Sequence, residues 1–96
     1  MEQAKRFIIR GNSSGVFFGE IAEQNGQTVG IRKCRRLWYW DGAASLSQLA
    51  DEGVKRPDNC KFTVTVDELY VLDAIEIIPC TDAACASIDS VPVWKM

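Results

Sequence analysis

Two arginines and two tryptophans stand close together in the middle of the chain, within Arg35-Arg36-Leu37-Trp38-Tyr39-Trp40. An indole ring can stack on another flat ring, and a guanidinium can make two parallel hydrogen bonds to a phosphate or a carboxylate. A nucleotide offers both a flat ring and negative charge. The segment therefore predicts a binding site for an anionic, nucleotide-like small molecule, formed by four side chains: Arg35, Arg36, Trp38 and Trp40.

The alternation of side chains along an extended strand predicts which of these residues share a face. One face would carry three of the candidates: Arg36, Trp38 and Trp40. The other face, directed at the core, would carry Leu37 and Tyr39. On this arrangement the second arginine of the pair is better placed than the first to meet an anion. The alternative is that the two tryptophans belong to the core or to a subunit interface, where Trp and Arg are both enriched.

Other chemistries lack the residues they need. The chain contains no histidine, which excludes His-based acid–base catalysis, His metal ligation and the Ser–His and Cys–His nucleophile pairs. Its four cysteines form no Cys-x-x-Cys pair of the kind zinc sites use, and we expect them to be free thiols: Cys34, Cys60, Cys80 and Cys85. The neighbouring carboxylates Asp51-Glu52 and Asp67-Glu68 would point apart. We therefore expect no catalytic residue, no metal and no cofactor, and a protein that is not an enzyme.

A turn at Ser13-Ser14-Gly15 has two interpretations. Its backbone amides could bind an anion, as the amides of turn nests do, although it lacks the spacing of a P-loop. The alternative is an ordinary hairpin turn.

Three short strands are expected in the first third of the chain: Phe7–Ile9, Val16–Ala22 and Thr28–Cys34. The Asn25-Gly26 pair predicts a type I′ hairpin turn, in which both central residues have positive φ. The three strands would form an antiparallel meander. Gly19 and Gly30 lie inside strands, where glycine often marks a bulge or a close backbone contact.

Capping signals and alternation predict the elements of the remaining chain. Ser45 begins a short helix with a Ser-x-x-Gln capping box, and Gly53 would end it in a left-handed conformation. Phe62–Val66 alternates apolar residues with threonine, which predicts a strand with one buried face. A strand at Ala74–Ile78, a helix over Asp82–Ile88 capped by Thr81 or Asp82, and an extended edge segment at Val91–Trp94 complete the expected elements.

The 96 residues suffice for one domain with one small core. Composition is that of an ordinary globular protein, with 47% hydrophobic and 25% charged residues. We expect a single α+β domain over residues 1–96, with residues 1–5 frayed. It would contain a small, mostly antiparallel sheet and two short helices.

Charge is divided unevenly along the chain, with a net +4 in residues 1–40 and a net −6 in residues 41–96. Such a division favours contact between copies or contact within one chain, and the alternative is an ordinary solvated surface. Together with the three tryptophans and the small core, it leads us to expect a homo-oligomer. A net charge of −2 does not suit duplex nucleic acid, and no apolar run is long enough to span a membrane. No basic and then apolar segment opens the chain, so we expect no secretory signal and a cytoplasmic location.

Two segments carry a resemblance to a known family. One is Arg35-Arg36-Leu37-Trp38-Tyr39-Trp40-Asp41-Gly42-Ala43-Ala44-Ser45-Leu46-Ser47-Gln48-Leu49-Ala50, and the other is Ala74-Ile75-Glu76-Ile77-Ile78-Pro79-Cys80-Thr81. Together with their spacing they resemble a family of small, uncharacterised phage and prophage proteins. The resemblance implies a phage-encoded protein acting in a bacterial cytoplasm, and it transfers no catalytic residue.

The sequence is therefore compatible with two functions. The first is a non-enzymatic homo-oligomer that binds or sequesters an anionic, nucleotide-like molecule, with a counter-defence role. The alternative is a protein-interaction module, an inhibitor or adaptor of a host or phage protein, that docks through exposed Trp and Arg residues.

Overall fold

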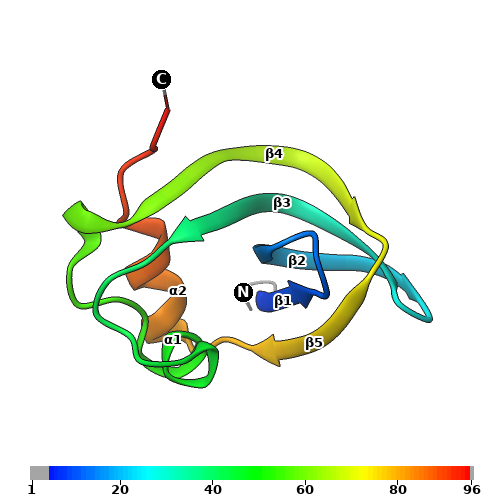
Figure 1. Cartoon of the computed structure of the whole chain (residues 1–96), viewed down its shortest axis with the longest axis horizontal. Coiled ribbons are helices and arrows are strands. Elements are labelled where there is room, and N and C mark those ends of the chain that lie inside the picture. Colours follow the sequence, from blue (N-terminus) through cyan, green and yellow to red (C-terminus); the bar gives the residue numbers. More distant parts are fainter. Residues whose placement is uncertain (1–4, 96) are drawn as a thin grey trace.

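A computed structural model describes residues 5–95. Residues 1–4, which belong to the stretch expected to be frayed, lie outside the described residues, and Lys5 is exposed and outside any element. The elements are β1 (Phe7–Gly11), β2 (Val16–Asn25), β3 (Thr28–Tyr39), α1 (Leu46–Glu52), a 3₁₀ turn (Pro57–Asn59), β4 (Lys61–Val71), β5 (Ala74–Pro79) and α2 (Asp82–Asp89). Figure 1 shows the two helices packed together at one end of the strands.

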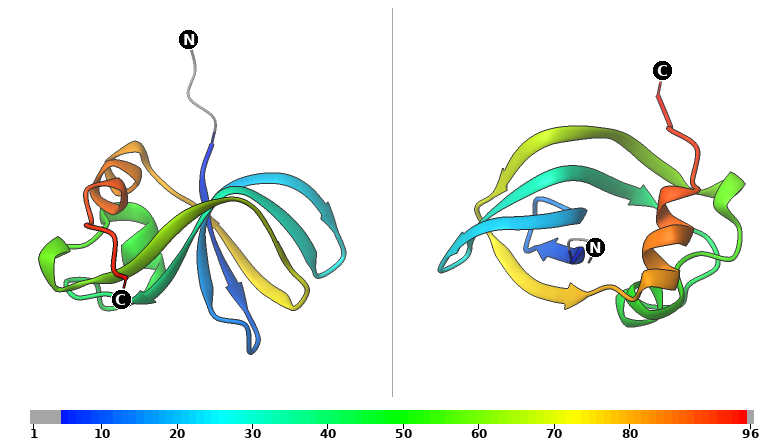
Figure 2. Two further views of the ribbon diagram at one scale, coloured as in Figure 1. Left: turned by 90° about the horizontal axis from the view of Figure 1, so that it is seen from above. Right: turned by 180° about the vertical axis from the view of Figure 1, so that it is seen from behind.

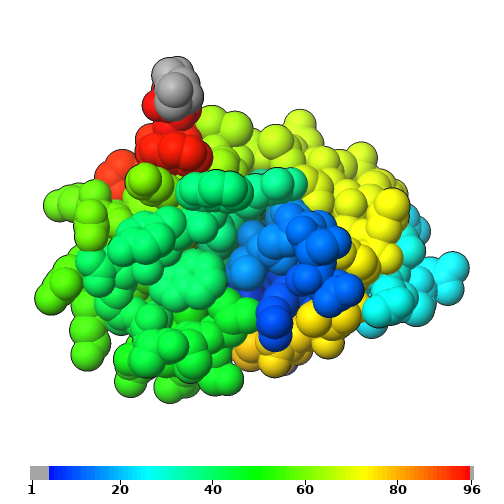
Figure 3. Space-filling view, in the orientation of Figure 1, coloured from blue at the N-terminus to red at the C-terminus, as the bar shows by residue number. Residues whose placement is uncertain are grey.

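All five strands form one antiparallel sheet in the order β4-β3-β2-β1-β5. The two edge strands, β4 and β5, are joined by only Leu72 and Asp73. The sheet must therefore curl until its edges meet at this turn, and the ribbon views show that curl (Figure 1 and Figure 2). In the space-filling view the blue N-terminal strands lie beside the yellow and orange chain of β5 (Figure 3). The expected α+β class is confirmed.

The N-terminal meander is confirmed, but its hairpin turn differs from the expected one. Asn25 pairs with Thr28, so the central residues of the β2–β3 turn are Gly26 and Gln27. Gly26 has φ +60°, whereas Gln27 is not among the residues with positive φ. The expected type I′ turn with Asn25 and Gly26 at its centre was therefore wrong. Positive φ at the first central residue alone is the pattern of a type II′ turn, in which that residue is glycine.

Glycines inside the strands mark bulges, as predicted. The β2–β3 register shifts between Phe18 and Glu20, and a Cβ on Gly19 would lie 2.8 Å from the carbonyl oxygen of Arg32. A second shift occurs between Ile21 and Glu23, opposite Gly30. At the first bulge Lys33 takes φ +51°, a left-handed conformation uncommon for a lysine.

Both faces of the sheet bury apolar side chains, because one face packs on the helices and the other lies inside the curl. The first cluster joins strand residues such as Ile8, Phe18 and Leu37 to Leu49 and Ile88 of the helices. The second cluster is formed by strand residues alone: Ile9, Phe17, Val29, Ile31, Cys34, Val71 and Ala74. The core thus has two halves, one on each side of the central strands.

The expected buried face of the Phe62–Val66 strand is present only at Phe62. Phe62 is fully buried in the first cluster, but Val64 and Val66 are 47% and 39% exposed. β4 is an edge strand, and the apolar clusters reach it only near its two ends, at Phe62 and at Val71. The alternating sequence was therefore misread as a strand with one continuous buried side.

Both helices begin at the predicted caps. The Ser45 hydroxyl accepts the Gln48 amide hydrogen at 3.2 Å, and the Thr81 hydroxyl accepts that of Ala84 at 3.1 Å. Gly53 ends α1 with φ +79° and ψ −150°, so its φ is positive as expected but it is not in the left-handed helical region. The helices are then joined where the Val54 amide donates to the Ser87 hydroxyl at 2.9 Å.

After α2 the chain turns back along the edge of the sheet. Val93 forms a parallel bridge with Phe62, and the Trp94 amide donates to the Phe62 carbonyl at 2.9 Å. The expected extended edge segment at Val91–Trp94 is thus found beside the start of β4. Within residues 5–95, no helix is long and apolar enough to cross a membrane.

Candidate functional site

The predicted binding segment does not form one site, because its side chains leave β3 in different directions. Arg35 is buried, with 6% of its surface exposed, while Arg36 is exposed. Trp38 is 64% exposed and Trp40 is half-buried. Arg35 is therefore buried, Arg36 and Trp38 are exposed, and Trp40 lies at the margin of the core.

Arg35 fixes the C-terminal end of α2 to the sheet. Its Nη1 donates to the Ile88 carbonyl at 2.9 Å, and its Nη2 donates to the Val91 carbonyl at 2.7 Å. Its Nε donates to the Thr63 carbonyl at 2.8 Å. Carbonyls at a helix C-terminus carry partial negative charge and lack partners within the helix, so a guanidinium suits them. Burial lowers the pKa of Arg35, and the nearby Asp89 opposes that change.

Arg36 points away from this contact. Its guanidinium lies over the ring of Phe17, 4.9 Å from the ring centroid. Its backbone amide donates to the Thr63 hydroxyl at 3.2 Å. Arg36 is therefore an exposed cation resting on an aromatic face, free of the backbone carbonyls that hold Arg35.

The predicted positions of Tyr39 and Trp40 were wrong. Tyr39, expected to face the core, is 47% exposed, and Trp40 packs against the first apolar cluster together with Leu37. The β3–β4 register shifts between Leu37 and Tyr39, so the alternation of the strand is interrupted there. Because β3 also ends at Tyr39, the next side chain is free to turn toward the core.

Trp38 instead meets a tryptophan from the far end of the chain. Its ring lies parallel to that of Trp94, with an interplanar angle of 6° and centroids 6.5 Å apart. The ammonium of Lys61 lies 5.6 Å from the centroid of the Trp94 ring. We call Trp38, Trp94, Lys61 and Arg36 the tryptophan surface. Trp94 was not predicted to take part, because its position depends on the long-range pairing of the C-terminal segment with Phe62.

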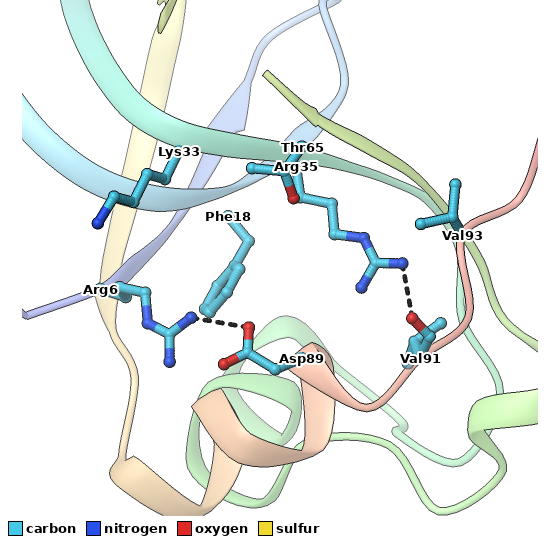
Figure 4. A pocket seen from close by; sticks show the side chains of 8 residues that line it. All are labelled: Arg6, Phe18, Lys33, Arg35, Thr65, Asp89, Val91 and Val93. Carbon is cyan, nitrogen blue, oxygen red and sulfur yellow. Dashed lines mark hydrogen bonds and ion pairs between the residues drawn. The ribbon is translucent and has the colours of Figure 1, made fainter. Parts of the chain in front are cut away.

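A cleft of about 320 Å³ opens where the sheet meets the end of α2 (Figure 4). Three basic side chains line it: Arg6, Lys33 and Arg35. The remaining lining residues are Phe18, Thr65, Asp89, Val91 and Val93. Arg6 donates to the Asp89 carboxylate at 2.7 Å and lies 5.0 Å from the centroid of the Phe18 ring. This bond to Asp89 raises the pKa of Arg6.

The Ser13-Ser14 amides do bind an anion, and it belongs to the chain itself. The amides of Ser13 and Ser14 donate to Oδ2 of Asp73 at 2.8 and 3.2 Å. The hydrogen bond from the Ser14 hydroxyl, together with those from the two amides and the Ser13 hydroxyl, lowers the pKa of Asp73 to about 2. The turn therefore joins two parts of the sheet, and its amides are already occupied.

The cysteines are free thiols in the structure. Burial raises the pKa of Cys34 to about 11 and that of Cys80 to about 12, so both are protonated at neutral pH. A protonated thiol is a poor nucleophile and a poor metal ligand. Among residues 5–95, no group of three Cys, Asp or Glu side chains is arranged to hold a metal ion.

Comparison with known proteins gives one match. A protein-family model described as Domain of unknown function (DUF6948) matches residues 4–88. No curated protein and no solved structure matches the chain.

Proposed function

We propose that this chain, which belongs to the family described as Domain of unknown function (DUF6948), is a non-enzymatic binding protein. It docks a partner protein through the tryptophan surface. The observation that carries the proposal is the Trp38–Trp94 pair. The two rings lie parallel to each other, and Trp38 is 64% and Trp94 38% exposed. Contiguous exposed apolar patches mark interaction surfaces, and Trp and Arg are both enriched at binding hot spots.

The charges beside the pair indicate the kind of partner. Lys61 covers part of Trp94, and Arg36 is exposed on the same strand as Trp38. Cations around an apolar centre suit a partner surface with an apolar centre and carboxylates at its rim. The partner is therefore expected to insert an apolar side chain at the tryptophans and to place acidic groups near the two cations.

The same geometry supports an interaction module more than a nucleotide-like ligand held by Arg35, Arg36, Trp38 and Trp40. Small-molecule sites are concave and bury most of the ligand. The Trp38 side chain is exposed, while Arg35 and Trp40 are turned toward the interior. A protein partner needs no concave pocket at this position.

The absence of enzymatic activity is part of the proposal. The sequence has no histidine, and Cys34 and Cys80 are protonated at neutral pH. Histidine is the commonest general base and a protonated thiol is a poor nucleophile, so these features support a non-enzymatic protein. From the family resemblance we also propose a phage-encoded protein acting in the bacterial cytoplasm, where its partner is a host or phage protein and the interaction counters a host defence.

Affinity capture from lysate of infected cells tests the proposal, with the captured proteins measured by quantitative mass spectrometry. The test variant is Trp38→Ser with Trp94→Ser. The control is Leu72→Ser, which removes a side chain that is 71% exposed in the β4–β5 turn, away from the tryptophan surface. We expect wild type and control to enrich the same protein, and the double variant to lose it while keeping its fold by circular dichroism. Undiminished enrichment by the folded double variant would contradict the proposal.

A further inference from the structure

We propose that the cleft beside Arg35 is a binding site for a small phosphate-bearing molecule with an apolar body. Arg35 pairs with Phe18 and Thr65 on the neighbouring strands, and all three line the cleft. Arg35 also bonds to the Ile88 carbonyl of α2, so the site lies on the helix-covered side of the sheet. It is separate from the tryptophan surface and does not depend on the function proposed for it.

The lining of the cleft has an excess of positive charge. Its lining holds three cations and one carboxylate, that of Asp89, which is already bound to Arg6. Lys33 reaches Glu20 at 3.6 Å from the rim, with 74% of its side chain exposed. Within residues 5–95, Arg35 has no carboxylate at ion-pair distance. Its direct partners are carbonyl oxygens, and Asp89 acts on it only from beyond ion-pair distance. An added anion would therefore be attracted to this position.

Arg35 has one N–H donor that no protein group occupies among the described residues. A guanidinium has five N–H donors. Arg35 donates four hydrogen bonds to backbone carbonyls, one from Nε, one from Nη1 and two from Nη2. The longest joins Nη2 to the Phe62 carbonyl at 3.4 Å. One Nη1 hydrogen therefore remains. Figure 4 shows the guanidinium extending into the cleft, with Arg6 and Lys33 on the opposite side. An oxyanion between them would receive charged hydrogen bonds from more than one direction.

The walls and the volume define the rest of the ligand. Phe18, Val91 and Val93 offer apolar surface, and Thr65 offers a hydroxyl. A volume of about 320 Å³ lies at the lower end of the range for small-molecule sites. It suits a phosphate monoester with a small ring or a short aliphatic chain, and it is too small for a dinucleotide.

Titration of the ¹⁵N-labelled full chain with inorganic phosphate and with phenyl phosphate, at constant ionic strength, tests this site. We expect saturable shifts at the amides of Arg35, Asp89 and Val91 but not at Gly26 in the distant β2–β3 turn. Phenyl phosphate should bind more tightly than phosphate, because its ring contacts the apolar wall. A site with Kd of ~1 mM would be nearly filled at ~10 mM ligand.

Variants decide whether the cleft itself binds. Lys33→Gln should weaken phenyl phosphate binding about tenfold, the loss of one charged hydrogen bond. Lys55→Gln, which removes an exposed lysine that does not line the cleft, should leave the affinity unchanged. Lys33 is used because a variant at Arg35 would also release the end of α2. The Trp38→Ser, Trp94→Ser protein should bind phenyl phosphate as wild type does, which separates this test from that of the proposed function.

Three results would overturn the proposal. One is the absence of saturable shifts with either probe. Another is equal weakening by the Lys33 and Lys55 variants, which would indicate general attraction of anions to the surface. The third is phenyl phosphate binding no more tightly than phosphate, since the apolar wall would then have no part in the site.

Discussion

Asp73 accepts hydrogen bonds from Ser14 at both carboxylate oxygens, from the hydroxyl at 2.5 Å to Oδ1 and from the amide at 3.2 Å to Oδ2. The two residues are far apart in sequence, and their contact lies where the two edges of the curled sheet meet. A backbone bond from the Asn12 amide to the Asp73 carbonyl, at 2.8 Å, reinforces it. A two-residue turn thereby connects opposite edges of the sheet and is held against the β1–β2 loop.

This contact predicts a loss of stability in acid. The pKa of Asp73 falls from 3.8 to about 2 because the folded protein hydrogen-bonds the ionised form. The stabilisation is therefore present above the unfolded pKa of 3.8 and is lost as the pH falls through about 2. Thermal melts between neutral pH and acid should show Asp73→Asn melting below wild type at pH 7, with the difference shrinking in acid. A constant difference across that range would contradict the assignment.

The two adjacent arginines should differ sharply in their effect on stability. Arg35→Met leaves the carbonyls of Thr63, Ile88 and Val91 without their donor, and we expect a loss of ~2–4 kcal/mol. Arg36→Met is the matched control, because its exposed guanidinium only rests on Phe17. Its effect should stay near ~0.5 kcal/mol. Urea unfolding of both variants checks the difference, and equal losses would show that Arg35 does not hold the end of α2.

The β2–β3 turn should depend on the backbone of Gly26. A Cβ at this position meets no atom within 4 Å, so any cost of substitution comes from its φ of +60°. Gly26→Val should lower the free energy of unfolding by ~1–2 kcal/mol, since a β-branched residue resists positive φ. Gly26→Asn, which tolerates this conformation, should cost less. If the valine variant melts with wild type, the turn has another conformation in solution.

Self-association remains a prediction of the charge division and of the exposed tryptophans. We expect light scattering at micromolar concentration to give a mass above that of the 10.7 kDa chain. Trp38→Ser should shift the mass toward the monomer if the tryptophan surface forms the contact, while Leu72→Ser should not. A mass near 10.7 kDa for wild type throughout the micromolar range would contradict the prediction.

The sequence by itself determined the features that rest on local contacts. Ser45 and Thr81 bind amides three residues along the chain, so their caps could be recognised without the rest of the fold. The β2–β3 hairpin was recognisable from the Asn25-Gly26 pair for the same reason. Its turn type was not, because Asn25 is compatible with both registers and strand pairing chooses between them.

Only the tertiary structure decided where the candidate binding residues lie. A register shift between Leu37 and Tyr39 exposes the tyrosine, and the end of β3 lets Trp40 turn toward the core. Arg35 is buried because α2 ends beside β3 and β4, and Trp38 has a partner because the C-terminal segment returns to Phe62. Each of these positions depends on pairing between residues distant in sequence. Alternation along one strand carries no information about bulges imposed by its neighbours, or about which later segment covers its face.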